Sequence, residues 1–158
     1  MKIYLDTSAF FYFFFENKEY SRGIKKIFDK IVRGEHKAVT SCFTIEELSY
    51  VILMKLIEKK YDKHPHEVLR EKKSSILEFV EDIRKIFSTI YSIDNIEILG
   101  SDKMQVWAIP QIMEECFLRP RDGVHLQTMR DCKIDHIVST DSDFDGIKGL
   151  VRLKPETM

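Results

Sequence analysis

Four acidic residues, far apart in the chain, each lie where a predicted strand ends or a predicted helix begins. They are Asp6 in the segment YLDTS, Glu47 in TIEEL, Asp122 in RDGVHL and Asp141 in STDSDF. No histidine, cysteine or serine is placed as clearly for nucleophilic attack. Carboxylates that meet in a fold repel one another unless a cation neutralises them, and hard divalent ions such as Mg²⁺ prefer oxygen ligands. The pattern therefore predicts a metal-dependent enzyme that acts on phosphate esters.

The first two acids also have simpler structural interpretations. Asp6 could be a turn residue after a strand, but Ser8 is a good N-cap for the helix that follows, which frees Asp6 for chemistry. Glu47 could complete a capping box with Thr44, in the T-x-x-E pattern of a helix start. Its neighbour Glu46 would point about a third of a turn away on a helix. The sequence favours Glu47 as the second acid, with Glu46 as the alternative.

The other two acids have alternatives of the same kind. Asp122 could be an N-cap after Pro120, and Asp141 could belong to an ordinary turn. The segment Asp141–Gly146 also matches the first half of a calcium-binding EF-hand loop, D-x-D-x-D-G. The twelfth loop position should be an acid that binds Ca²⁺ through both oxygens, and here it is Arg152. The EF-hand interpretation is therefore rejected.

Length and composition predict one domain, residues 1–158, with an apolar core. The chain has 158 residues, of which 44% are hydrophobic. Its formal net charge is −1, so nucleic-acid binding would require a local basic patch rather than an overall positive charge. Arg119 and Arg121 flank Asp122 and are the first candidates to attract nucleic acid to the acidic residues.

The cysteines and the N-terminal segment predict a cytoplasmic protein with no membrane anchor. The three cysteines, Cys42, Cys116 and Cys132, show neither disulfide-framework nor CxxC spacing, which is typical of a reducing compartment. The start MKIYLD carries an acid within what would be the apolar part of a signal peptide. The Phe-rich run 9–15 is far too short to span a bilayer.

Strand and helix patterns alternate along the chain and predict an α/β fold, a three-layer sandwich with a parallel sheet of about five strands between helices. The expected strands are Lys2–Leu5, Ala38–Ser41, Ile96–Leu99, Ile134–Ser139 and Leu150–Leu153. The expected helices are 8–16, 21–33, 44–60, 65–90, 102–117 and 122–130. Ligands bind such sheets at the carboxyl ends of the strands. All four acids are expected to meet at that edge.

Two apolar stretches exceed what one small domain easily hides. One is the Phe-rich run 10–15, and the other is a seven-residue repeat along the predicted helix 65–90, made by Leu69, Ile76, Ile83 and Ile90. Burying such surface between subunits is favourable, at roughly 25 cal/mol per Å². We therefore expect a homodimer, with packing of both stretches into one internal core as the alternative. Trp107 is expected in the core or in an interface.

The four acidic segments together resemble the motifs of the PIN domain family, most closely those of its VapC-type toxin ribonucleases. Leu5–Ala9 looks like the first acidic motif and Glu47–Leu48 like the second. The segment DGVHLQT from Asp122 is similar to the family's D-A-x-H-L-A-T, and Ser139–Phe144 resembles its T-x-D-x-D-F ending. The resemblance implies a five-stranded parallel sheet, a Mg²⁺- or Mn²⁺-dependent ribonuclease, a homodimer and a cognate antitoxin that holds the enzyme inactive.

Within this resemblance, each acid has an expected role in cleaving an RNA phosphodiester. The expected direct or water-mediated metal ligands are Asp6, Asp122 and Asp141, with Asp143 as an accessory ligand. Glu47 is expected to bind a metal or to orient the attacking water, and Ser8 to hydrogen-bond a carboxylate or a water on the metal. The alternative is a non-catalytic PIN domain that binds RNA or protein in RNA processing. Retention of all four acids favours the enzyme.

Overall fold

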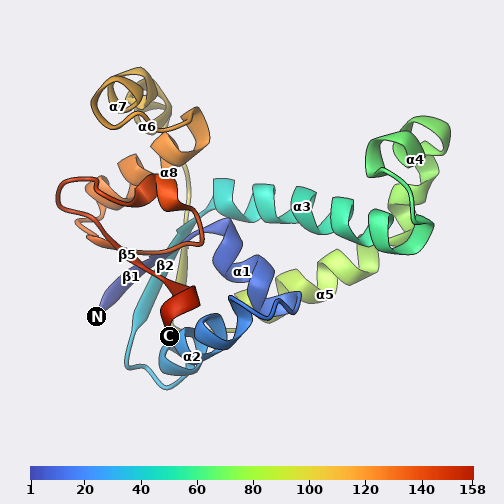
Figure 1. The fold of residues 1–158 in the computed structure, drawn as a ribbon, viewed down its shortest axis with the longest axis horizontal. Coiled ribbons are helices and arrows are strands. Elements are labelled where there is room, and N and C mark those ends of the chain that lie inside the picture. Colours follow the sequence, from blue (N-terminus) through green and yellow to red (C-terminus); the bar gives the residue numbers. More distant parts are fainter.

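Figure 1 shows the computed structural model of the protein, which describes residues 1–158. A fully parallel sheet of five strands runs through it in the order β3-β2-β1-β4-β5. The strands are β1 (Lys2–Leu5), β2 (Lys37–Ser41), β3 (Ile96–Leu99), β4 (His136–Val138) and β5 (Val151–Leu153). The predicted α/β class and the five parallel strands are confirmed, although β4 is shorter than expected at both ends.

Helices cover both faces of this sheet (Figure 1). They are α1 (Thr7–Phe14), α2 (Ser21–Val32), α3 (Cys42–Tyr61), α4 (Pro65–Glu71), α5 (Val80–Tyr91), α6 (Lys103–Trp107), α7 (Ile109–Cys116) and α8 (Pro120–Asp131). Three short 3₁₀ segments are η1 (Lys73–Glu78), η2 (Ser142–Phe144) and η3 (Pro155–Thr157). Helix α3 extends away from the sheet and carries α4 at its far end. None of these helices combines the length and the apolar character needed to cross a membrane.

Side chains alternate across the sheet and divide the core into two parts. Ile3 and Leu5 of β1 pack with α1, α2 and the first half of α3. Tyr4, which lies between them in sequence, packs on the opposite face with Leu126 of α8. This period of two is the geometry of a strand that is buried on both faces. Because both faces of β1 are buried, a carboxylate can reach solvent only after the strand ends, and Asp6 is the first residue after it.

The long helix predicted over 65–90 is wrong, because the chain breaks there into three segments. Lys72 (φ −140°, ψ 79°) ends α4, and η1 separates α4 from α5. In a straight helix Val68 and Phe79 would lie about 16 Å apart along the axis. Here both pack with Ile57 of α3 in one small apolar cluster. The burial of these side chains at the far end of α3 thus outweighs the continuity of the helix.

The helix predicted over 102–117 is likewise two helices, α6 and α7, which meet at Ala108. Pro110 lies in the first turn of α7, where its missing N–H and fixed φ are tolerated. Inside a continuous helix its ring would clash with the preceding turn. Trp107 ends α6 with 80% of its surface exposed. The prediction that Trp107 lies in the core is wrong, and its place in an interface stays a prediction.

Both apolar stretches that suggested a homodimer contact the core of this same chain. Phe10 is fully buried, and residues 11–15 are partly buried against the core cluster beneath α1. Within the predicted repeat, Ile90 is buried in that cluster and Ile83 packs against it. Internal packing is thus complete for Phe10 and Ile90 and partial for residues 11–15 and Ile83. The homodimer itself stays a prediction.

Candidate functional site

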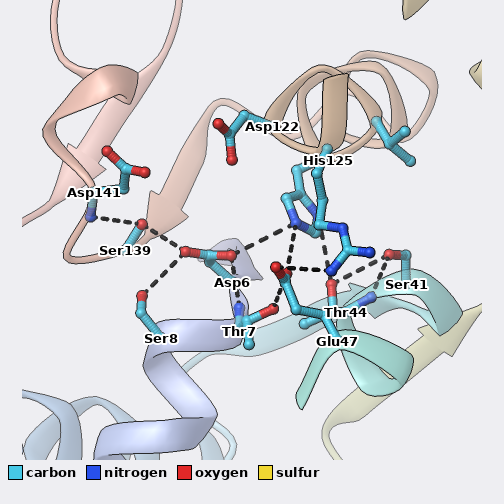
Figure 2. Close-up of polar contacts among 12 residues, drawn as sticks. Asp6, Thr7, Ser8, Ser41, Thr44, Glu47, Asp122, His125, Ser139 and Asp141 are labelled. Carbon is cyan, nitrogen blue, oxygen red and sulfur yellow. Dashed lines mark hydrogen bonds and ion pairs between the residues drawn. The ribbon is translucent and has the colours of Figure 1, made fainter. Parts of the chain in front are cut away.

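The carboxyl ends of β1, β2 and β4 meet at one edge of the sheet, and the four acids gather there (Figure 2). Asp6 directly follows β1, and Asp141 follows the neighbouring β4. Glu47 comes from α3, which begins where β2 ends, and Asp122 comes from the first turn of α8. The strand order changes direction at β1, which is where ligands bind in open parallel sheets. The four acids line one cavity of about 390 Å³, and we call this edge of the sheet, with the side chains around the cavity, the rim.

Asp6 lies at the centre of a hydrogen-bond network. Its carboxylate accepts from the backbone N–H of Thr7 at 2.6 Å and from the hydroxyls of Ser8 at 3.0 Å and Ser139 at 2.7 Å (Figure 2). Asp6 is itself the N-cap of α1, so the prediction that Ser8 caps this helix is wrong. Because α1 begins directly after the strand, Ser8 lies in its first turn and reaches back to Asp6. The three donors fix the orientation of the carboxylate.

Glu47 faces the same rim from the first turns of α3. The N-cap of α3 is Ser41, whose hydroxyl accepts from the N–H of Thr44. Thr44 is therefore already the third helical residue, and the predicted capping box between Thr44 and Glu47 is wrong. Glu47 instead accepts a hydrogen bond from Thr7 Oγ1 at 2.6 Å and pairs with Arg121 Nη1 at 3.0 Å.

Glu46 and Glu47 have clearly different surroundings. The side chain of Glu46 is 63% exposed and lies 3.7 Å from Arg121, whereas that of Glu47 is 23% exposed. Burial acts to raise the pKa of Glu47, but its interactions with His125, Thr7 and Arg121 outweigh burial and lower that pKa to about 2. Glu47 is therefore ionised at neutral pH and points into the rim, while its catalytic role stays a prediction.

His125 is a residue of the rim that the search for acids missed. Its side chain is 1% exposed, and Nε2 lies 3.7 Å from Asp6 Oδ1 and 3.8 Å from Glu47 Oε2. On the other side of the ring, Nδ1 lies 3.0 Å from the hydroxyl of Tyr4, whose pKa burial raises to about 12. A signal was present in the sequence, because Asp122 and His125 have the i, i+3 spacing that places two helical side chains on one face.

Neutral hydroxyl groups complete this network and were also missed. The hydroxyl of Tyr4 lies 3.1 Å from Ser41 Oγ and 3.2 Å from Thr44 Oγ1. Thr7 donates to Glu47, and Ser139 donates to Asp6 (Figure 2). In a sequence, small hydroxyl residues beside strand ends look like ordinary caps and turn formers. Only the fold shows that they hold two carboxylates in place.

Arg119 joins the remaining acids into a second group. Its Nε lies 3.0 Å from Asp122, and its Nη2 lies 2.6 Å from Asp141 and 3.5 Å from Asp143. Arg119 is also the N-cap residue of α8, so the alternative of Asp122 as an N-cap is wrong. Burial raises the pKa of Asp122 above its usual value, a shift that Arg119 opposes and the charge of Asp141 reinforces.

Both arginines that were expected to attract nucleic acid are thus paired with acids of the rim. Arg119 contacts three aspartates, and Arg121 contacts Glu47 and Glu46. Their side chains are 67% and 48% exposed, so both remain accessible from solvent. Two cations against at least four carboxylates leave the rim negative. A role for the arginines in binding nucleic acid stays a prediction.

The donor atoms of the rim fit a divalent cation. They form two groups of three, and within each group the ligand atoms lie within 4.8 Å of one another. The first group is Asp6, Glu47 and His125, and the second is Asp122, Asp141 and Asp143. Five of these six residues offer carboxylate oxygens, the hard ligands that Mg²⁺ and Mn²⁺ prefer. The second group includes Asp143, which was expected as an accessory ligand.

The structure also disagrees with an EF-hand. Strand β4, rather than a helix, precedes the segment that begins at Asp141. Asp145 is neutralised by Arg152 and Lys154, each at 3.0 Å, and is not free to bind Ca²⁺. Arg152 occupies the position where such a loop needs its final acid.

Comparisons with known proteins identify the family. A model of the PIN domain family matches residues 3–150. The chain therefore belongs to the PIN domain family. None of the curated proteins matches its sequence.

Several solved structures share the fold at low sequence identity. VapBC2 from Rickettsia felis, bound to a DNA fragment from its promoter, is 15% identical with a TM-score of 0.60 over 98% of each chain. VapC20 from Mycobacterium tuberculosis, a sarcin-ricin loop cleaving toxin, is 12% identical with a TM-score of 0.64 over 97% of this chain and 99% of that chain. DNA-bound VapBC from Salmonella typhimurium is 19% identical with a TM-score of 0.55 over 98% of each chain. At these identities the likeness establishes the fold.

Proposed function

We propose that this chain is a divalent-metal-dependent ribonuclease that hydrolyses RNA phosphodiesters, and that it is the toxin of a toxin–antitoxin pair. The observation that carries the proposal is the meeting of Asp6, Glu47, Asp122 and Asp141 around one cavity of a PIN fold. The similarly folded VapC20 is a toxin that cleaves the sarcin-ricin loop, which supports RNA as the substrate class.

The chemistry follows from the two groups of ligand atoms. A Mg²⁺ or Mn²⁺ ion bound at the rim would supply positive charge facing the phosphate and a water of lowered pKa. Glu47, whose pKa of about 2 keeps it ionised, would bind a cation or accept a hydrogen bond from the attacking water. The hydroxyl of Ser8 would keep Asp6 oriented as a ligand. The proposed ligands are Asp6, Asp122 and Asp141, with Asp143 as an accessory.

Cleavage of single-stranded RNA by the purified protein tests this proposal. We expect cleavage with Mg²⁺ or Mn²⁺, none with EDTA, and a loss of about 100-fold or more in Asp122→Asn and Asp141→Asn, since even outer-shell partners of a metal are worth 10–100-fold. The matched control is Asp82→Asn, which makes the same change on the exposed surface of α5. Full activity in either rim variant would refute the site. RNA binding without cleavage by the wild type would instead support a non-catalytic PIN domain.

The proposed toxin would have two protein partners, a cognate antitoxin and a second copy of itself. The VapBC complexes of R. felis and S. typhimurium have this fold, which supports the antitoxin. A homodimer is supported by a different surface from the one first expected. Large apolar side chains stand exposed on α6, on α7 and at the residue that follows α7, and groups of such residues commonly mark protein interfaces. They are Met104, Trp107, Met113 and Phe117.

A further inference from the structure

Arg119 is the only cation in contact with the carboxylates of Asp122, Asp141 and Asp143. One guanidinium reaches all three, through Nε to Asp122 at 3.0 Å and through Nη2 to Asp141 at 2.6 Å and Asp143 at 3.5 Å. These three residues also form the second group of potential metal ligands, with oxygens within 4.8 Å of one another. The guanidinium therefore occupies the space that a cation bound by this group would need.

The side chain of Arg119 is able to leave this position. The arginine side chain is 67% exposed, so water can solvate its guanidinium when it leaves, whereas the side chains of Asp122 and Asp141 are 14% and 30% exposed and stay in place. Its backbone is fixed, in contrast, because Arg119 is the N-cap of α8 with extended angles (φ −65°, ψ 156°) and precedes Pro120, which restricts it to that region. Only the side-chain torsions need to change. The guanidinium would then stay close to the rim, because the backbone that carries the side chain does not move.

Within the other group of potential ligands, Asp6 is held in a different way from Glu47, which pairs with Arg121. Asp6 accepts hydrogen bonds from Thr7, Ser8 and Ser139, and none of these donors carries a charge. Such donors can keep their positions when a cation arrives, because they do not repel it. Arg119 cannot, because a guanidinium and a divalent cation repel each other strongly at contact distance.

We propose that Arg119 is an internal counter-cation, which leaves its three aspartates when a divalent cation binds and then contacts a phosphate of the RNA. Metal would thus bind before RNA, and the metal would release the arginine that helps to hold the substrate. A guanidinium suits this second task, since its planar fork matches two phosphate oxygens. The inference rests on the proposed function and assigns the order of binding at the same site.

Two binding measurements test the inference without use of the nuclease activity. The first is Mn²⁺ affinity, from the electron paramagnetic resonance signal of free Mn²⁺, for wild type, Arg119→Gln and Arg119→Lys. We expect Arg119→Gln to bind Mn²⁺ about three- to tenfold more tightly, corresponding to roughly 0.7–1.4 kcal/mol. Arg119→Lys, which keeps the charge but loses the fork, should fall between the two. The control Arg130→Gln removes a cation of α8 that pairs with Glu115, and should leave the affinity unchanged.

The second measurement is the affinity for a short single-stranded RNA in Ca²⁺, with a gel to verify that the RNA stays intact. Arg119→Gln should bind this RNA at least about threefold more weakly. The slope of log affinity against log salt concentration should decrease by about 1, as expected for the loss of one phosphate contact. If Arg119 had only a structural role, Arg119→Gln would not both tighten Mn²⁺ binding and weaken RNA binding. Equal Mn²⁺ affinity in wild type and Arg119→Gln, or unchanged RNA affinity, would overturn this inference alone. Absence of Mn²⁺ binding by the wild type would overturn the proposed metal site as well.

Discussion

Glu47→Gln should destabilise the metal-free protein, whereas Asp122→Asn should stabilise it, although each removes one carboxylate from the same rim. Glu47 has partners that favour its charge, the hydroxyl of Thr7 at 2.6 Å and Arg121 at 3.0 Å. These contacts and the nearby His125 ring overcome its burial and lower its pKa to about 2. A neutral amide loses the ion pair and leaves Arg121 without its nearest partner.

The size of the Glu47 effect follows from linkage between protonation and folding. Lowering the pKa from 4.5 to about 2 corresponds to roughly 3 kcal/mol at 1.36 kcal/mol per unit. Solvent screening reduces this value, because the partner Arg121 is 48% exposed, so we expect about 1–2 kcal/mol at pH 7. Since the folded pKa lies below the unfolded one, this stability is fully present above about pH 4.5 and is lost as the pH falls through 2.

Asp122 should behave in the opposite way. Burial raises its pKa, against the effect of Arg119, so the charged form is less favourable in the folded chain than in the unfolded one. At neutral pH the charge therefore costs stability in the absence of metal, and asparagine removes that cost. The advantage of Asp122→Asn should disappear in acid, where the carboxyl is protonated in both states.

Urea unfolding in EDTA at pH 7 and pH 3 measures both effects. The stability lost in Glu47→Gln should shrink to under about half between these two pH values. Glu46→Gln is the matched control, since Glu46 is 63% exposed, and it should retain both stability and RNA cleavage while Glu47→Gln loses cleavage. A Glu47→Gln variant as stable as the wild type at pH 7 would contradict the role of this ion pair, and loss of activity in Glu46→Gln instead of Glu47→Gln would move the site to Glu46.

Three further changes have outcomes that follow from single contacts. Tyr4→Phe deprives the buried Nδ1 of His125 of its 3.0 Å partner and should cost about 1–3 kcal/mol in urea unfolding, whereas no loss would show that the hydroxyl is dispensable. Gly23→Ala would ordinarily stabilise a helix by about 1 kcal/mol. Here the new Cβ would lie 2.1 Å from the carbonyl oxygen of Pro155, so we expect a loss of about 1–3 kcal/mol instead, and a gain would contradict this packing. Trp107→Ser should shift the light-scattering mass from a dimer toward 18.7 kDa; a wild type that is already monomeric would remove the homodimer proposal.

The sheet could be predicted because its strands are short apolar runs, and the three central strands β1, β2 and β4 are also buried on both faces. The strand pattern also predicts that Asp6 and Asp141 lie at the same edge of the sheet, since residues just after parallel strands share one edge. Helix caps were less predictable. Ser8 and Thr44 are both acceptable caps by residue type, but the choice of Asp6 and Ser41 depends on the residue at which each strand ends.

Other features depend on long-range contacts that periodicity does not contain. The repeat through Ile76 and Ile83 is compatible with one long helix, and only the packing of Val68 and Phe79 on α3 favours a break. The pairing of Arg119 with three aspartates likewise needs η2 to lie beside the start of α8. Charged residues next to an acidic motif suggest a substrate contact as readily as an internal ion pair, so the sequence could not distinguish the two.

The most direct test of the central claim is the single-turnover rate at which Asp6→Asn cleaves single-stranded RNA in saturating Mn²⁺. Asp6 is the carboxylate that three hydrogen-bond donors hold at the centre of the rim. We predict a rate at least about 100-fold below that of the wild type. Circular dichroism and urea unfolding should verify that the variant is folded. Cleavage at the wild-type rate by folded Asp6→Asn would contradict the account, because the rim would then not be the site of RNA hydrolysis.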